Sequence, residues 1–315
     1  MVGESREHRD SVRAMPPWSV DDIPDQTGRT ALVTGANSGL GLHTSLALAR
    51  RGGRVLMACR NPAKAGEALD RVTTEVRGAK AELVQVDLAS LDSVRAAADD
   101  VRSRTASLDI LVDNAGVMAI PRAQTVDGFE MQLGTNHLGH FALTGLLLPL
   151  LLAATSPRVV VVSSDAHKIG RIRFDDLMGE KSYGRWSAYG QSKLANLLFM
   201  RELARRAGDR LAAVGAHPGY AATNLQSNYG NPVVDLFMKI GNRVIAQSDE
   251  AGAWPQLYAA TMPDVKTADY FGPSGMFGLR GAPHRDTPTR AASDDETARR
   301  LWEVSEQLTG VTYPF

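Results

Sequence analysis

Short apolar runs alternate with longer segments of helical periodicity along most of this chain. The first run, 30–33, leads into a glycine-rich turn, and apolar or small residues then follow at Leu42, Ser45, Leu46 and Ala49, the spacing of one helix face. Further runs predict strands at 54–59, 81–86, 108–112, 158–162, 211–216 and near 270–271, with helices predicted at 61–76, 90–104, 127–154, 187–207 and 294–308. This alternation predicts an α/β fold with a doubly wound parallel sheet of about seven strands and helices on both faces.

Two parts of the chain depart from this alternation. Residues 1–28 contain a Pro-Pro pair and lack a sustained period, so we expect an N-terminal arm that is partly irregular, with Trp18 as its anchor. Residues 29–315 are expected to form one domain. Its least regular part, 220–265, mixes helical stretches with loops rich in Asn, Gly and Pro.

The composition narrows the partners and the compartment. Among the 315 residues, 35 basic side chains balance 35 acidic ones, so net charge gives no support for a nucleic-acid or anionic-membrane partner. Cys59 stands alone and excludes an intramolecular disulfide, which favours a reducing, cytoplasmic location. The N-terminus lacks the apolar centre of a signal peptide. The apolar stretch 141–154 is too short to span a membrane and contains Gly145 and Pro149, so it predicts a buried helix.

The turn 34–41 has the geometry of a phosphate site. Its glycines tolerate positive φ and let backbone N–H groups approach a ligand at the N-terminus of the following helix. The spacing is G-x-x-x-G-x-G, which differs from the G-x-G-x-x-G of the standard dinucleotide fingerprint. Taken alone, the turn is weak evidence, because a tight connection with close helix packing can have the same pattern.

Polar and glycine residues end the predicted strands, and in an open α/β sheet this edge binds ligands. The strand ends carry Gly35, Cys59, Arg60, Asp87, Asn114, Ala115, Gly116, Ser163, Ser164, His217, Pro218 and Gly219. Nearby in the chain, Tyr189 and Lys193 are four residues apart and so share one helix face. Bringing a tyrosine pKa from about 10 to neutral requires on the order of 4 kcal/mol, which a close positive charge supplies. The alternative is an incidental pair on a solvated face.

Taken together, these motifs resemble the short-chain dehydrogenase/reductase family in the family's own order. The match consists of the glycine turn, Asn114-Ala115-Gly116, Ser164, and Tyr189 with Lys193, and it covers about 28–310. The sequences Ala-Cys-Arg at 58–60, Thr-Asn-His-Leu-Gly-His-Phe at 135–141 and Ser-Lys-Leu-Ala-Asn at 192–196 resemble the branch of retinol dehydrogenases and carbonyl reductases. The resemblance implies a Rossmann-type domain.

The resemblance also implies catalytic roles. Tyr189 would be the acid/base, Lys193 would lower its pKa and hold the nicotinamide ribose, and Ser164 would hydrogen-bond the substrate oxygen. Asn136 would complete a tetrad through a water relay to Lys193. Two features differ from the compact family pattern. Asp113 replaces the first Asn of Asn-Asn-Ala-Gly, and Ser164 lies 25 residues before Tyr189, so that the added segment 171–186 is expected to border the substrate entrance.

The residues at the end of the second strand decide between NAD(H) and NADP(H). An acidic residue there would bind a ribose 2′-OH and repel a 2′-phosphate, but this chain has Cys59 followed by the guanidinium of Arg60. NADP(H) is therefore favoured, with NAD(H) as the alternative. Asp87 is expected to accept from the adenine amino group, or simply to cap the next helix. The full predicted cofactor set is Gly35, Asn37, Ser38, Gly39, Leu40, Gly41, Arg60, Asp87, Leu88, Asn114, Ala115, Gly116, Tyr189, Lys193, Pro218, Gly219 and Thr223.

The sequence thus favours an NADP(H)-dependent oxidoreductase that interconverts a carbonyl and an alcohol, with no metal. His137 and His140 have no evident third ligand and fit a structural role better than a metal site. The expected substrate is a small apolar or aromatic molecule, covered by Tyr220, Leu225, Tyr229, Phe237, Met238 and Trp254 unless these complete the core. The alternatives are the same reaction with NAD(H), or a non-catalytic cofactor-binding regulator. The sequence leaves open whether the chain forms homo-oligomers through the helices that contain Asn136 and Tyr189.

Overall fold

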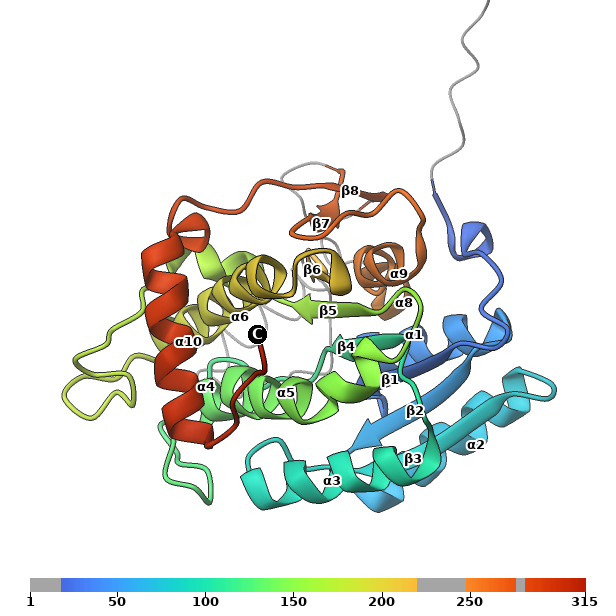
Figure 1. The fold of residues 1–315 in the computed structure, drawn as a ribbon, viewed down its shortest axis with the longest axis horizontal. Coiled ribbons are helices and arrows are strands. Elements are labelled where there is room, and N and C mark those ends of the chain that lie inside the picture. Colours follow the sequence, from blue (N-terminus) through green and yellow to red (C-terminus); the bar gives the residue numbers. More distant parts are fainter. Residues whose placement is uncertain (1–17, 220–247, 276–280) are drawn as a thin grey trace, which may run out of the picture.

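A computed structural model describes residues 18–219, 248–275 and 281–315. Within them, one eight-stranded sheet has the order β3-β2-β1-β4-β5-β6-β7-β8 (Figure 1). All neighbours pair in parallel except β8, which is antiparallel to β7. The strands are β1 Thr30–Thr34, β2 Arg54–Cys59, β3 Lys80–Gln85, β4 Ile110–Asp113, β5 Arg158–Val162, β6 Ala212–Ala216, β7 Tyr270–Pro273 and β8 Pro283–Arg285. The strand order reverses between β1 and β4, which is the switch point where doubly wound sheets bind nucleotides.

Helices cover both faces of the sheet, and each face has its own apolar core. Helices α3, α5, α6 and α10 pack on one face, and α1, α2 and α9 on the other. The helices are α1 Gly39–Arg50, α2 Pro62–Glu75, α3 Leu91–Arg104, α4 Met131–Leu133, α5 Gly139–Leu152, α6 Arg185–Ala207, α8 Asp249–Gly252, α9 Trp254–Thr261 and α10 Asp295–Thr309. Short 3₁₀ segments are η1 Val20–Asp22, η3 Asp165–Ile169, η4 Gly208–Arg210 and η6 Ala291–Ser293, and η2 Gly134–Leu138 is a π turn.

The valine run of β5 explains why the strands read as continuous apolar segments. Val159 and Val161 belong to the core on the α5–α6 side, whereas Val160 and Val162 belong to the core on the α1–α9 side. Because successive side chains of a strand point to opposite faces, a strand buried on both sides needs an apolar residue at every position. The predicted α/β sheet with helices on both faces is therefore confirmed.

Several helices begin where the sequence predicts. The side chain of Asn61 accepts from the backbone N–H of Lys64 at 3.1 Å, with Pro62 in the first turn of α2. Ser90 caps α3 in the same way, accepting from Ser93 N at 3.3 Å. A side-chain oxygen at the N-cap satisfies a backbone donor that has no partner inside the helix, so these starts are fixed locally.

The predicted helix 127–154 begins later than expected. Asp127 lies outside it, because its carboxylate accepts from the backbone N–H of Leu91 at the start of α3. Glu130 provides the cap instead, accepting from Gln132 N at 3.0 Å and Leu133 N at 2.7 Å. The helical run then passes through the π turn η2 before α5.

The sheet also has one strand more than the seven expected, because the three-residue β8 lacks a distinct apolar pattern.

Trp18 anchors the described part of the N-terminal arm. Its ring meets the rings of Trp254 and Tyr258 edge-on, with centroids 6.1 and 5.6 Å apart. Its indole N–H donates to the sulfur of Met262 at 3.3 Å. The arm is thereby held against α9, as the sequence analysis expects for this tryptophan.

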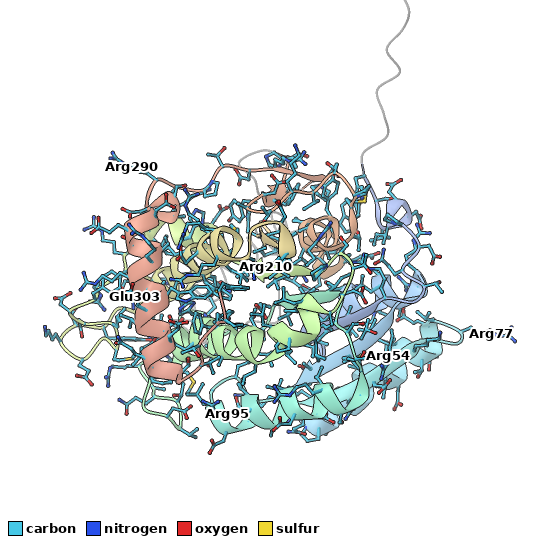
Figure 2. All side chains as sticks on the ribbon, viewed as in Figure 1. Arg54, Arg77, Arg95, Arg210, Arg290 and Glu303 are labelled. Atoms are coloured by element: carbon cyan, nitrogen blue, oxygen red, sulfur yellow. The ribbon has the colours of Figure 1, made fainter. Side chains whose placement is uncertain are left out.

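Arg77 and Arg290 lie on the outside of the molecule and project away from it (Figure 2). Within the described ranges, no helix combines the length and apolar character that crossing a bilayer requires. The apolar stretch that raised this question forms α5, most of whose side chains, including Phe141 and Leu147, are buried in the core.

Candidate active site

The glycine turn closes directly onto the start of α1. Gly35 and Gly39 have φ of +68° and +52°, the left-handed region that glycine adopts without strain. A Cβ on Gly41 would collide with the carbonyl oxygen of Gly35 and lie 2.7 Å from Asn114 Nδ2. The turn therefore requires glycine for backbone shape and for close approach, and it leaves Asn37, Ser38 and Leu40 at the N-terminus of α1.

The segment Asn114-Ala115-Gly116 lies beside the glycine turn and forms one wall of the expected nucleotide site, called the nucleotide wall below. The backbone N–H groups of Asn114 and Ala115 both donate to the hydroxyl of Thr34 at 2.9 Å. The Asn114 side chain donates to the Thr34 carbonyl at 2.8 Å. This wall and the glycine turn are thus joined at the switch point between β1 and β4, where the sequence analysis places a nucleotide.

Gln256 on α9 completes this wall, and the sequence analysis missed it. Its side chain is 2% exposed and donates to the hydroxyl of Thr44 at 2.6 Å and to Asn114 Oδ1 at 3.2 Å. It ties α9 to α1 and to the nucleotide wall across 142 residues of sequence. In the sequence, Gln256 is only a single polar residue in a short apolar helix. No local pattern relates it to Asn114.

The end of β2 presents a buried thiol and an exposed guanidinium. Burial raises the pKa of Cys59 to about 11, although hydrogen bonds from the backbone of Ala36 and Asn37 oppose the shift. Arg60 is exposed, and its guanidinium has no ion-pair partner among the described residues. The arginine is therefore free to bind a ligand at the carboxyl edge of the sheet.

Asp87 is not the N-cap of α3, because Ser90 occupies that position, so the capping role that the sequence analysis offers as an alternative is wrong. The Asp87 carboxylate accepts from Ala89 N at 3.0 Å, while its backbone N–H donates to the Ser93 hydroxyl at 2.8 Å. These bonds shape the connection from β3 to α3. The neighbouring Leu88 is buried, and its backbone touches Gly139 so closely that a Cβ there would collide with the Leu88 carbonyl oxygen. A contact of Asp87 with adenine stays a prediction.

Ser164, Tyr189 and Lys193 come together at the carboxyl end of β5. The Ser164 hydroxyl accepts from Ala166 N at 3.2 Å and hydrogen-bonds the Tyr189 phenol, which favours the phenolate. The Lys193 ammonium lies 5.8 Å from the centre of the Tyr189 ring and donates to the carbonyl of Val162 at 3.1 Å. The predicted trio is therefore one cluster, formed by a strand end and one face of α6.

Asn136 lies in the π turn η2, next to this cluster. Its side chain exchanges two hydrogen bonds with the backbone of Val117, at 2.8 and 2.9 Å, and donates to the Ser192 hydroxyl at 2.9 Å. A Cβ on Gly116 would lie 3.0 Å from Asn136 Oδ1 and 3.5 Å from Lys193 Nζ. Asn136 Oδ1 and Lys193 Nζ thus both lie close to Gly116, and a relay between them stays a prediction. π turns of this kind recur at functional sites.

Burial dominates the titration of the two central groups. It raises the pKa of Tyr189 to about 12, with Ser164 opposing the shift, and it lowers the pKa of Lys193 to about 8. The sequence analysis expects Lys193 to lower the tyrosine pKa. In the protein alone the opposite shift results, because removing the phenolate from water outweighs the nearby hydrogen bond.

Comparison with known proteins decides the family. The family model for the short chain dehydrogenases matches residues 29–233. The chain belongs to the short-chain dehydrogenase family. It is 42% identical to human retinol dehydrogenase 14 over 299 residues, covering 90% of this chain and 87% of the human protein. It is also 40% identical to mouse polyprenol dehydrogenase over 295 residues, covering 91% and 86%.

Among solved structures, an uncharacterized protein from Mycobacterium paratuberculosis has a TM-score of 0.79 and 43% identity, covering 95% of this chain and all of that one. The resemblance to retinol dehydrogenases stated from the motifs is therefore confirmed. The protein is a short-chain dehydrogenase that acts on alcohol or carbonyl groups with an NAD(P) cofactor.

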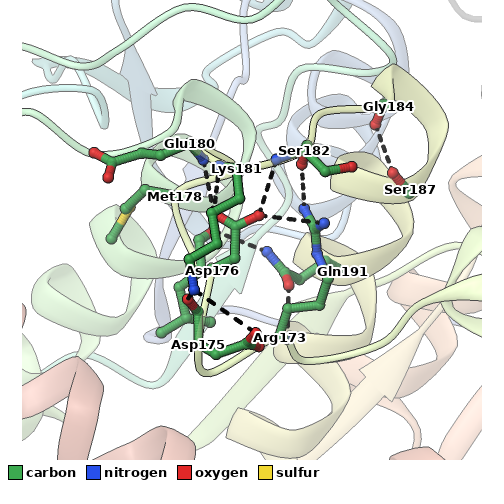
Figure 3. A network of polar contacts seen from close by, with 12 residues as sticks. Arg173, Asp175, Asp176, Met178, Glu180, Lys181, Ser182, Gly184, Ser187 and Gln191 are labelled. Atoms are coloured by element: carbon green, nitrogen blue, oxygen red, sulfur yellow. Dashed lines mark hydrogen bonds and ion pairs between the residues drawn. The ribbon is translucent and has the colours of Figure 1, made fainter.

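The segment added before Tyr189 in this short-chain dehydrogenase is hydrogen-bonded to α6. Asp176 accepts from the backbone of Glu180, Lys181 and Ser182, at 2.7, 3.1 and 3.2 Å (Figure 3). Gln191, two residues after Tyr189, accepts from Arg173 N at 2.9 Å and donates to the carbonyl of Leu177 at 3.0 Å. These bonds fix the segment beside α6, and its role as a border of the substrate entrance stays a prediction.

The end of β6 is shaped by a histidine. Gly219 has φ of +66°, and its N–H donates to His217 Nδ1 at 3.3 Å. The other ring nitrogen of His217 lies 2.9 Å from Asp286 Oδ2, and this bond lowers the pKa of Asp286 to about 2. Pro218 and Gly219 thus stand on the same rim as the other predicted cofactor residues. Thr223 and the predicted covering residues lie outside the described part of the chain, except Trp254, which is half-buried and packs on Trp18.

The two histidines of the π turn and α5 have structural partners. His140 contacts the Thr34 hydroxyl at 2.9 Å and the Asn136 carbonyl at 3.0 Å, and His137 contacts the Ser305 hydroxyl at 2.9 Å. Burial lowers their pKa values to about 4 and about 3, so both rings are neutral. Across the described residues, no cluster of three or more His, Cys, Asp or Glu side chains is placed to hold a metal ion.

Proposed function

We propose that this protein is an NADP(H)-dependent oxidoreductase that interconverts a carbonyl and an alcohol on an apolar or aromatic substrate. The hydrogen-bonded pair of Ser164 and Tyr189, with Lys193 beside it, carries the proposal. The cofactor supplies the hydride when bound. The remaining chemistry is the movement of one proton at the substrate oxygen, which these side chains perform.

In the reductive direction, Tyr189 acts as the general acid. With a pKa of about 12 in the protein alone, its phenol holds its proton at neutral pH and can deliver it to the substrate oxygen. The Ser164 hydroxyl, hydrogen-bonded to that phenol, would stabilise negative charge on the same substrate oxygen. Lys193, buried and held by the Val162 carbonyl, supplies positive charge below pH 8 and stabilises the phenolate that remains.

NADP(H) is preferred because of the end of β2. A carboxylate there would repel a 2′-phosphate, but the side chain is the buried, neutral thiol of Cys59, and the exposed guanidinium of Arg60 follows it. Guanidinium groups bind phosphate through two parallel N–H donors. The glycine turn fits the pyrophosphate of either nucleotide, so Arg60 is the residue that distinguishes them.

The deciding experiment is reduction of a panel of aldehydes and ketones with NADPH and with NADH. Tyr189→Phe should keep NADPH binding and lose turnover, and wild-type turnover in this variant would refute the proton role. Arg60→Ala should weaken NADPH by about 10-fold or more, as expected for one lost charged hydrogen-bond pair, and NADH by much less. Equal losses for both nucleotides would refute the NADP(H) preference.

A further inference from the structure

Few large apolar side chains are exposed, and two of them lie on the two elements that hold Ser164 and Tyr189. Among the described residues, the exposed ones are Val126 at 82%, Ile169 at 62% and Trp186 at 42%. Ile169 ends η3, the short helix that Ser164 caps. Trp186 lies in the first turn of α6, one turn before Tyr189. Exposed apolar groups that gather beside a reactive centre are typical of ligand sites.

The two elements that carry these side chains are in backbone contact. A Cβ on Gly190 would lie 2.9 Å from the carbonyl oxygen of Ala166 and 3.2 Å from the Cα of Gly170. Gly170 directly follows Ile169, and Gly190 directly follows Tyr189. The elements that carry Ile169 and Trp186 are therefore packed against each other beside Tyr189.

Trp186 is held in position by its surroundings. Its ring meets the ring of Tyr189 edge-on, with centroids 6.1 Å apart and planes at 77°. The carbonyl of the preceding Arg185 accepts from Gln132 Nε2 at 3.0 Å, and the Gln191 bonds shown in Figure 3 tie the next turn of α6 to the added segment. A tryptophan ordered before binding gains contact area at little cost in entropy.

We propose that Ile169 and Trp186 form a subsite that binds the apolar part of the substrate beyond its reacting carbonyl or alcohol group. The inference rests on the proposed function and adds the residues that select substrates by length. The Tyr189 phenol marks where the polar end of the substrate lies. From there an alkyl chain of several carbons, or a fused ring system, reaches the indole face and the isoleucine side chain. Short polar carbonyl compounds would not reach either one.

The test compares Trp186→Ala and Ile169→Ser with Val126→Ser, an exposed apolar residue elsewhere in the chain. With the preferred cofactor, kcat/KM for decanal should fall by about 10-fold or more in the first two variants, within the range for lost apolar pocket contacts. For butanal it should change by less than about twofold. Val126→Ser should match wild type on both. Equal losses on the two aldehydes, or no loss on decanal, would overturn the subsite.

A second readout separates the subsite from the proposed function. Binding of 1-decanol to the protein saturated with NADP⁺ is measured by calorimetry, and Trp186→Ala should weaken it by about 10-fold. Unchanged binding in Trp186→Ala would overturn the subsite. A wild-type protein that binds decanol through Trp186 but reduces no carbonyl would leave the subsite standing and refute the oxidoreductase reaction.

Discussion

The carboxyl group of Asp113 accepts a hydrogen bond from the Thr144 hydroxyl through Oδ2, at 3.0 Å, and its other oxygen is buried without a partner among the described residues. Asp113 ends β4 and is fully buried. Burial raises its pKa from 3.8 to about 8, so the group is mostly protonated at neutral pH. This is the position where the resembling family pattern has an asparagine. The protein therefore holds a neutral acid there in place of an amide.

Asp113→Asn should stabilise the protein, increasingly so at higher pH. A carboxyl whose folded pKa is raised from 3.8 to about 8 contributes full stability below pH 4, which is lost as the pH rises to 8. The amide has no charge to bury, so the gain should be near zero at pH 4 and should grow by up to about 1.4 kcal/mol per pH unit between pH 4 and pH 8. Urea unfolding at several pH values measures it. Asp70→Asn, on the exposed side of α2, is the matched control, and a gain independent of pH would contradict the account.

Lys193→Met should abolish turnover and yet stabilise the fold. Burial lowers the lysine pKa from 10.5 to about 8, so below pH 8 the folded protein carries the cost of a buried charge. Between pH 8 and 10.5 the folded group is already neutral and this cost disappears. The methionine variant should therefore gain about 1–3 kcal/mol at pH 7 and less at pH 10. Thermal or urea unfolding at both pH values checks this, with the exposed Lys64→Met as control. A destabilised variant at pH 7 would show that the Val162 bond outweighs the burial cost.

Gly170→Ala should slow catalysis without weakening cofactor binding. Its Cβ would collide with the carbonyl oxygen of Gly190, which belongs to the backbone of α6 and cannot rotate away. Moving η3 from α6 separates Ser164 from Tyr189, and misplacement by about 1 Å can cost about 100-fold in rate. We expect kcat to fall by about 10- to 100-fold with an unchanged Kd for NADPH. Gly66→Ala on α2, where nothing lies within 4 Å, should keep full activity. A variant with unchanged kcat would show that the contact does not set the separation.

Gln256→Leu should weaken the nucleotide and spare the chemical step. The leucine cannot donate to Asn114 Oδ1 or Thr44, so the wall beside the glycine turn loses its orienting bond. The Kd for NADPH should rise by about 5- to 10-fold, the loss of roughly one hydrogen bond, while kcat at saturating cofactor stays near wild type. Fluorescence titration measures the first quantity and steady-state kinetics the second. Gln307→Leu, exposed on α10, is the control. A fall in kcat with unchanged Kd would place the role of Gln256 elsewhere.

The features that the sequence predicts correctly are those fixed by neighbouring residues. The valines of β5 and the cap at Asn61 depend on side chains within one turn or one strand. The sequence also brings the members of the catalytic trio to one site, because strand ends and helix faces are set by topology and period. Gln256 escapes prediction since its partner lies on another strand end, and Asp127 is misread because its carboxylate serves a distant helix.

The pKa values of the site residues could not be predicted from the sequence either. The spacing of Tyr189 and Lys193 places them on one helix face, but the sequence does not reveal how deeply that face is buried. Burial sets the direction of both pKa shifts, and it results from elements packed around the site from many parts of the chain. Position in the fold is thus easier to predict than titration.

The reaction of the buried Cys59 thiol with a reagent can measure how often the sheet opens around β2. Cys59 is the single thiol of the chain, it is 3% exposed, and burial raises its pKa to about 11, so in the native state it neither ionises nor meets a reagent. Alkylation of the protein must then wait until the sheet opens around β2. The rate of that reaction, with and without nucleotide, measures how strongly a ligand at the rim holds the first half of the sheet closed.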